Sequence, residues 1–293
     1  MGIVGTMRRT LGLRSGPRPP PSQQRDEGVL RIDRRRTFLD DDLQARFEDV
    51  GFVVVDLLDP SGVASLLDRF SAMDHLAPER YDWVEGFSTS IYDSRPDYRA
   101  SVLDAIEEHV APAFEPILDR YRIMFANFVV KEPHSDQVPP HVDWTFLDEE
   151  RFSSVTVWCP LVDTTVENGT LGLVSGSHRR IDFLRAVNIP TIERCEAAVA
   201  DIGERPIIEL SAGQAIILDN RAVHFSPPNT TDQPRIAIGC VAGPVEADLH
   251  HYWKDEDDRL LRFQVERSFY LSYVIGTPPA EVDGVVTATL TSA

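Results

Sequence analysis

The stretch that decides the fold is SVTVWCPLVDTTVENGTLGLVSGSH, residues 154–178. It is rich in β-branched and apolar residues, and its pattern predicts strands over Ser153–Leu161 and Leu171–Val174. Between them the sequence NGT at 168–170 predicts a tight turn, because glycine permits a positive φ. The stretch therefore predicts two strands of a β-rich core joined by a turn.

Strand patterns also dominate on both sides of this stretch. Further short β-rich segments are divided by Gly, Pro, Asn or Asp, and they cover Ile123–Val130, Arg205–Leu210, Gln214–Leu218 and Arg235–Val241. We find no alternation of strands and helices, and no GxGxxG or P-loop sequence, so nucleotide-binding folds of those kinds are disfavoured.

Helices are expected before residue 121. Asp40–Asp42 offer N-cap oxygens for a helix that Gly51 ends, the strand Phe52–Asp56 follows, and Asp59-Pro60 opens a second helix. The spacing of Val102, Ile106 and Val110 predicts a third helix. Pro112 either ends it or starts a short helix that runs to Arg120. Helices followed by many short strands predict an α+β chain, mainly β in its core, forming a jelly roll or barrel.

Charge and composition restrict the partners. The 293 residues carry 47 acids and 29 bases, a net charge of −18, which disfavours nucleic acid and anionic membranes as partners. Three unpaired cysteines and no secretory signal favour a cytoplasmic protein. Residues 1–36 hold nine arginines and a proline-rich run, so we predict a basic, disordered tail there, ranked above a transit peptide, and a single domain over 37–293.

One histidine lies in a pattern typical of a metal site. In PPHVDW, residues 139–144, His141 and Asp143 are two apart, so on an extended strand both side chains point to one face. His224, after the strand that ends at Leu218, supplies a third ligand. Two histidines and one carboxylate form the facial triad of non-haem Fe(II) oxygenases. An HxD pattern also occurs by chance in many chains.

Arg235 strengthens the metal interpretation. It lies eleven residues after His224, and if the two open neighbouring strands of a hairpin, the guanidinium can point into the same cavity. A planar guanidinium binds a carboxylate through two parallel hydrogen bonds, as the far end of a keto acid that chelates iron would require. The alternative is an ordinary surface arginine.

These residues resemble the Fe(II)/2-oxoglutarate-dependent oxygenases, in the phytanoyl-CoA dioxygenase-like branch. The resemblance rests on FEDVGFVVVDLLDP, HVDW, residues 154–178, AGQAIILDNRAVHFSPPN and PRIAI, and it covers almost all of 38–293. It implies a double-stranded β-helix (jelly roll, cupin-like) with flanking N-terminal helices. It also implies Fe(II), 2-oxoglutarate and O2, with His141, Asp143 and His224 as catalytic metal ligands and Arg235 on the far carboxylate of 2-oxoglutarate.

Further roles follow from the same resemblance. Thr156 and Trp158 lie where relatives contact the co-substrate, and Asn127 is a further candidate; core packing is the alternative for the pair Thr156 and Trp158. His178 is expected to fix a loop by hydrogen bonding near the site mouth. Because halogenating relatives have a small residue in place of Asp143, oxygen transfer is expected. His134, His250 and His251 are expected on the rim or surface.

The predicted function is hydroxylation, or another oxidation, of an unactivated C–H bond in a small molecule of specialised metabolism, with release of succinate and CO2. The lids over the substrate are expected from the aromatic-rich segments 81–97 and 250–274 and from Trp144 and Phe146. Two alternatives remain: a cupin-like metal enzyme that uses no keto acid, which would not need Arg235, and a non-catalytic binding module, which would need no triad. The oligomeric state is left open.

Overall fold

The structure is a computed structural model, and it describes residues 34–73 and 84–291. The predicted basic tail lies outside the described residues up to position 33. Its last three residues contact the domain: the Arg35 amide donates to the Arg151 carbonyl at 2.9 Å, and Arg36 pairs with Asp41 at 2.6 Å. Within the described ranges, no helix is both long and apolar enough to cross a membrane.

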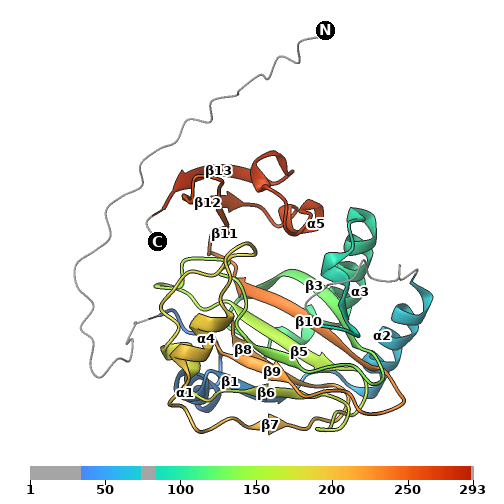
Figure 1. Cartoon of the computed structure of the whole chain (residues 1–293). Helices are drawn as coiled ribbons and strands as arrows, with labels where there is room; N and C mark the ends of the chain where they lie inside the picture. The colour runs from blue at the N-terminus through green and yellow to red at the C-terminus, as the bar shows by residue number, and fades with distance from the viewer. Residues whose placement is uncertain (1–33, 74–83, 292–293) are drawn as a thin grey trace.

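Two antiparallel sheets face each other and form the jelly roll (Figure 1). The six-stranded sheet has the order β1 (Phe52–Asp56), β8 (Gln214–Asp219), β5 (Val155–Pro160), β10 (Arg235–Pro244), β3 (Tyr121–Lys131) and β2 (Phe87–Thr89). The four-stranded sheet has the order β4 (Val138–His141), β9 (His224–Ser226), β6 (Leu171–Leu173) and β7 (Ile207–Ile208). The predicted mainly β core is confirmed.

The stretch that opened the sequence analysis crosses between the sheets. Its first half forms β5 in the six-stranded sheet, and its second half forms β6 in the four-stranded sheet. Gly169, in the turn between them, has a φ of 78°, and a Cβ there would approach the Lys131 side chain to 2.7 Å. The glycine is therefore required both by the backbone and by the close contact.

The first two N-terminal helices form where their caps predict them. α1 (Asp41–Val50) begins after Asp40, whose side chain accepts the Leu43 amide, and ends at Gly51 with φ 88°. α2 (Pro60–Ala72) begins after Asp59, whose carboxylate accepts the Gly62 amide. Both caps satisfy amides that the first helical turn leaves without a partner.

The expectation for Pro112 is wrong. α3 (Pro96–Phe114) continues through Pro112, and residues 115–120 form no helix. Val110 and Phe114, on either side of the proline, are both buried in the core between the helices and the six-stranded sheet. Burial of these side chains holds the last turn although the proline removes one backbone hydrogen bond.

The C-terminal region forms a third sheet that the sequence pattern did not indicate. β11 (Leu249–Lys254), β12 (Leu260–Val265) and β13 (Val285–Leu290) pair antiparallel, with α5 (Phe269–Ser272) between β12 and β13. Figure 1 shows this sheet at one end of the jelly roll. Its apolar side chains share a cluster with Phe125, Phe146 and Val241, so it supports the strands from outside. The remaining elements are α4 (Ile192–Ala198) and the short helices η1 (Ser90–Tyr92), η2 (Ser177–Arg179) and η3 (Pro279–Glu281).

The predicted hairpin between His224 and Arg235 does not form. β9, which begins at His224, pairs with β4 and β6, whereas β10, which begins at Arg235, pairs with β3 and β5. The two residues thus enter the jelly roll from opposite sheets. They still face the same cavity, because the interior of the jelly roll lies between the sheets.

Candidate active site

A cavity of about 370 Å³ opens between the two sheets. Strands from both sheets and the segments beside them contribute to its wall. All seven residues selected from the sequence line it: Asn127, His141, Asp143, Thr156, Trp158, His224 and Arg235. The structure therefore brings together residues that are up to 108 positions apart, as the site prediction requires.

Two histidines form one wall of the cavity. His141 ends β4 and His224 begins β9, and the two are direct cross-strand partners with ring centroids 4.2 Å apart. His141 Nδ1 lies 2.8 Å from the Pro139 carbonyl and His224 Nδ1 lies 3.0 Å from the Ala222 carbonyl. A carbonyl only accepts, so each Nδ1 carries the proton and Nε2 is the nitrogen suited to bind a metal.

Desolvation favours the metal-binding form of the first histidine. Burial, and then the neighbouring His224, lower the pKa of His141 to about 4. The imidazole is therefore neutral at neutral pH, and a neutral imidazole is the form that ligates a metal.

Asp143 is the third predicted ligand. Its Oδ2 accepts a hydrogen bond from Thr156 Oγ1 at 2.5 Å, and Thr156 Oγ1 also lies 3.0 Å from Asn220 Oδ1. Within 34–73 and 84–291, no three His, Cys, Asp or Glu side chains are grouped closely enough to hold a metal ion. The donor set, two imidazoles and one carboxylate on one cavity, fits Fe(II), and coordination by the triad stays a prediction.

The opposite end of the cavity is cationic. Arg235 is 1% exposed, its guanidinium carbon lies 5.2 Å from the Trp158 ring centre, and burial lowers its pKa to about 9. Its Nε and Nη1 are buried, and neither makes a hydrogen bond to any described residue. A buried cation with two unmatched donors needs an anion, and the distal carboxylate of 2-oxoglutarate has the matching shape.

Lys131 is a second buried cation that sequence analysis missed. It is the cross-strand partner of Arg235, is 0% exposed, and donates through Nζ to Ser226 Oγ at 2.9 Å and to the Pro227 carbonyl. Burial, and then the charge of Arg235, lower its pKa to about 7. Neither cation forms an ion pair within the described part of the chain. The available signal was a lysine that ends an otherwise apolar strand.

The three remaining candidates lie between these two ends. Thr156 and Trp158 share one face of β5, as predicted, with Thr156 at the Asp143 carboxylate and Trp158 beneath Arg235. Asn127 donates through Nδ2 to Thr89 Oγ1 at 2.5 Å. Their contact with a co-substrate stays a prediction.

The other histidines divide into two groups. His178 is buried and its Nε2 lies 3.1 Å from the carbonyl of Glu48 in α1, so it makes a hydrogen bond as expected; a role in fixing a loop near the site mouth stays a prediction. His134 is exposed, as expected. The expectation that His250 and His251 lie on the rim or surface is wrong, because both lie in β11 of the third sheet and are only 8% and 4% exposed.

Apolar side chains form the open end of the cavity. Phe87, Ile91 and Tyr92 from the expected segment 81–97 line it, together with Trp144 and Phe146. The segment Ala186–Ile192, which sequence analysis did not single out, forms another part of the wall. Of the described residues in 250–274 none lines the cavity, so the expected C-terminal lid is wrong.

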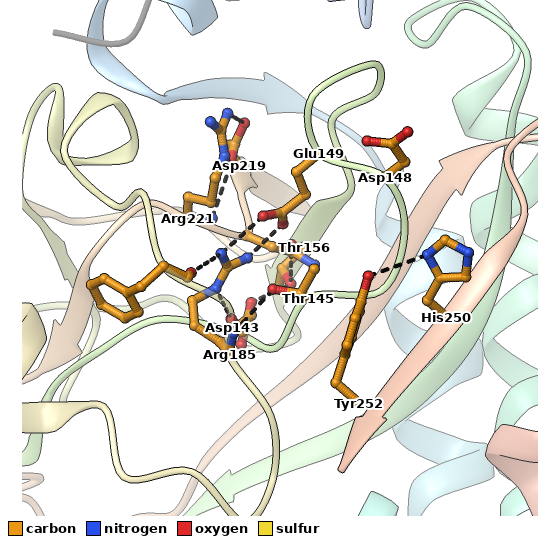
Figure 2. A network of polar contacts seen from close by, with 12 residues as sticks. Asp143, Thr145, Asp148, Glu149, Thr156, Arg185, Asp219, Arg221, His250 and Tyr252 are labelled. Carbon is orange, nitrogen blue, oxygen red and sulfur yellow. Dashed lines mark hydrogen bonds and ion pairs between the residues drawn. The ribbon is translucent and has the colours of Figure 1, made fainter. Parts of the chain in front are cut away.

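Two arginine–carboxylate ion pairs lie close to Asp143, and sequence analysis missed both (Figure 2). Arg221, in the loop that leads to His224, binds Asp219 at the end of β8 with two side-chain bonds of 2.8 and 2.6 Å. Burial alone would raise the pKa of Asp219, but the charge and hydrogen bonds of Arg221 hold it well below its usual value. Arg185 binds Glu149 in the same bidentate manner. Neither arginine belongs to a sequence pattern that predicts burial.

A jelly roll with two histidines, an aspartate and a buried arginine on one cavity defines the class of cupin-like, metal-dependent oxygenases. Residues 47–237 match the phytanoyl-CoA dioxygenase (PhyH) family, and the chain belongs to this family. The resemblance to Fe(II)/2-oxoglutarate-dependent oxygenases of this branch is thereby confirmed.

Curated relatives match over a limited length. The chain is 31% identical over 108 residues to the phytanoyl-CoA dioxygenase domain-containing protein 1 homolog of Dictyostelium discoideum, covering 34% of this chain and 38% of that protein. It is 30% identical over 120 residues to phytanoyl-CoA dioxygenase domain-containing protein 1 of Bos taurus, covering 38% and 40%. The match thus spans about two fifths of these relatives.

Solved structures share the fold over a greater length. The non-heme α-ketoglutarate-dependent carbocyclase SnoK from nogalamycin biosynthesis aligns with a TM-score of 0.53 and 21% identity, covering 72% of this chain and 86% of that one. HygX from Streptomyces hygroscopicus, crystallised with nickel and 2-oxoglutarate, aligns with a TM-score of 0.52 and 16% identity, covering 75% and 94%. These likenesses confirm the jelly-roll fold.

Proposed function

We propose that the protein is an Fe(II)/2-oxoglutarate-dependent dioxygenase that hydroxylates, or otherwise oxidises, an unactivated C–H bond of a small molecule. In the hydroxylation, one oxygen atom of O2 enters the substrate as a hydroxyl group. The other enters 2-oxoglutarate, which leaves as succinate and CO2. Fe(II), when bound, supplies the oxidising chemistry, and the protein supplies orientation and exclusion of water.

The buried guanidinium of Arg235 is the observation that carries this proposal. Arg235 lines the cavity that the histidine pair and Asp143 also line, and its buried Nε and Nη1 have no partner among the described residues. A cupin-like metal enzyme without a keto acid has no use for such a group, and a binding module has no use for the histidine pair. A ligand with a metal-binding end and a distal carboxylate satisfies both ends of the cavity.

Each residue then has a distinct task. His141, His224 and Asp143 would hold Fe(II), with the Nδ1 bonds to Pro139 and Ala222 keeping both rings in the required tautomer. Arg235 would bind the distal carboxylate through two parallel hydrogen bonds, and the Trp158 ring beneath it limits the movement of the guanidinium.

The open end of the cavity favours a neutral, apolar substrate. Its described lining consists mainly of aromatic and aliphatic side chains, and apart from Arg235, Asp143 and the two histidines the described lining carries no charged group. Such a wall gives no anchor for the phosphates of an acyl-CoA or for an amine. Participation in specialised metabolism draws support from the structural likeness to SnoK, which comes from nogalamycin biosynthesis.

The cellular setting is part of the proposal. Cys159, Cys195 and Cys240 are buried and free, which suits a reducing cytoplasm. The net charge of −18 argues against a nucleic-acid or anionic-membrane partner.

Anaerobic addition of Fe(II) and 2-oxoglutarate to the apoprotein tests the function. A visible charge-transfer band is expected in the wild-type protein and not in His224→Ala. Absence of the band from the folded wild-type protein would reject the proposal. Screening neutral small molecules for stimulated succinate release then identifies the substrate.

A further inference from the structure

Arg185 is a charged side chain in an unusual place. It lies between η2 and α4, outside any regular element, yet it is 1% exposed. Burying a guanidinium is strongly unfavourable unless its donors are matched by good acceptors. The acceptors of Arg185 therefore indicate its role.

The guanidinium of Arg185 donates to the predicted metal ligand Asp143 and to Glu149. Arg185 Nε donates to the Asp143 carbonyl at 2.8 Å, Nη1 donates to Glu149 Oε2 at 2.9 Å and to the Phe183 carbonyl at 3.2 Å, and Nη2 donates to Glu149 Oε1 at 2.5 Å. Figure 2 shows the guanidinium between Glu149 and Asp143. The planar fork matches the Glu149 carboxylate and leaves Nε directed at the main chain of Asp143.

With this contact, Asp143 is held at three points. Thr156 donates to its carboxylate, the Asn220 carbonyl accepts its amide at 3.1 Å, and Arg185 donates to its carbonyl. Fixing the amide and the carbonyl fixes the main chain on both sides of the Cα atom. The direction of the carboxylate relative to the histidine pair follows from that main-chain position.

The same arginine also anchors part of the cavity wall. The Thr145 amide donates to the Arg185 carbonyl at 3.0 Å, and the Arg185 amide donates to Thr145 Oγ1 at 3.2 Å. Ala186 and Val187, the next two residues, line the open end of the cavity. Arg185 therefore joins the substrate-facing wall to the segment that carries Asp143.

We infer that Arg185 and Glu149 form a positioning pair for Asp143: Glu149 fixes the guanidinium, and the guanidinium fixes the main chain of the ligand carboxylate. This inference rests on the proposed function, since Asp143 needs such positioning only as a metal ligand. Residues that orient metal ligands from behind typically change metal affinity by about 10–100-fold when they are replaced.

The sharpest test replaces one atom of the acid. Glu149→Gln keeps the size of the side chain but loses the charge and one acceptor, and Glu150→Gln makes the same change at an exposed neighbour. Co(II) titration of the folded apoproteins, followed by absorbance, is the readout. We expect the Co(II) dissociation constant to rise about tenfold in Glu149→Gln and to match the wild type in Glu150→Gln.

A second set of variants separates positioning from folding. Arg185→Met removes the contact with Asp143, and Arg185→Lys restores a cation that can donate to Glu149 or to the Asp143 carbonyl. The matched control is Arg180→Met, which breaks an exposed pair with Asp201 at 3.5 Å in the same segment. We expect the dissociation constant to rise most in Arg185→Met, to recover in part in Arg185→Lys, and to stay unchanged in Arg180→Met.

The outcomes distinguish the inference from the proposed function. A wild-type protein that binds neither Co(II) nor Fe(II) contradicts the function itself. A wild-type protein that binds, with Glu149→Gln equal to Glu150→Gln, overturns the inference alone. A purely structural pair would lower the melting temperature of Glu149→Gln and Arg185→Met but leave the Co(II) affinity of the folded protein unchanged.

Discussion

The two ends of the cavity are built differently. At the closed end, Arg235 lines the cavity from β10, and its cross-strand partner Lys131 on β3 is not among the lining residues; the backbone ladder fixes the separation of the two. At the open end, the wall comes largely from η1 and from segments such as 144–146 and 186–192, between strands. The closed end is cationic and deeply buried, whereas the open end is mainly apolar.

This difference matches two tasks: binding a co-substrate that is the same in all relatives, and binding a substrate that differs between them. A co-substrate that never changes suits a site on rigid strands, because a guanidinium in a fixed position matches a carboxylate in a fixed position. A substrate that differs between relatives suits loops, which tolerate changes in sequence without loss of the core. The histidine pair lies where the two ends meet.

We expect the largest effect, a loss of metal affinity, from a substitution in the histidine pair. His224→Ala removes one of the two neighbouring imidazoles that line the cavity, so Co(II) or Fe(II) affinity should fall by more than about 100-fold. Metal titration monitored by absorbance measures the change. His134→Ala, an exposed histidine paired with Asp232, is the control and should bind as the wild type does. Equal affinities for the two variants would place the metal elsewhere.

The second-largest effect should be a loss of affinity for 2-oxoglutarate at the closed end. Arg235→Leu removes both hydrogen bonds to the distal carboxylate, so 2-oxoglutarate should bind about 10–100-fold more weakly. Affinity for 2-oxobutanoate, a keto acid without that carboxylate, should stay the same as in the wild type. Both constants can be measured by titrating the charge-transfer band. A similar loss for both keto acids would show that Arg235 acts on the fold rather than on the carboxylate.

Lys131 should add a pH dependence to the closed end. Its pKa is lowered to about 7 by burial, so the free protein loses this cation as pH rises through 7. A neutral amine attracts a carboxylate less, and 2-oxoglutarate affinity should therefore fall by up to about tenfold between pH 6 and 8.5. In Lys131→Met the profile should be flatter, with affinity at pH 6 near the wild-type value at pH 8.5. A wild-type profile in Lys131→Met would assign the dependence to another group.

The smallest effect on co-substrate binding is expected from the open end. Val187→Asp places a charge on the apolar wall, so stimulation of succinate release by a neutral substrate should be lost. Affinity for 2-oxoglutarate should change by less than about twofold, because the change lies away from the cationic pair. Val245→Asp, at an exposed position outside the cavity lining, is the matched control. Weakened co-substrate binding in Val187→Asp alone would show that the two ends are coupled.

Local patterns determined much of the fold. Asp40, Asp59 and Gly51 predicted the helix ends, because a cap needs only the residues of one turn. The two-residue spacing of Thr156 and Trp158 placed both on one face of β5, because alternation is a property of a single strand. The motif order that resembles the family predicted which distant residues would line one cavity.

Only the tertiary structure decided which strands are partners. The sequence predicted that His224 and Arg235 begin neighbouring strands, whereas they enter from opposite sheets, because strand pairing depends on residues far apart in the chain. The same reason explains the missed residues. Lys131 becomes a second cation only beside Arg235, and Arg185 becomes buried only where Glu149 and the Asp143 carbonyl match its donors. A charged side chain can be buried only where partners match its charge or hydrogen bonds, and the fold brings these partners together from distant parts of the chain.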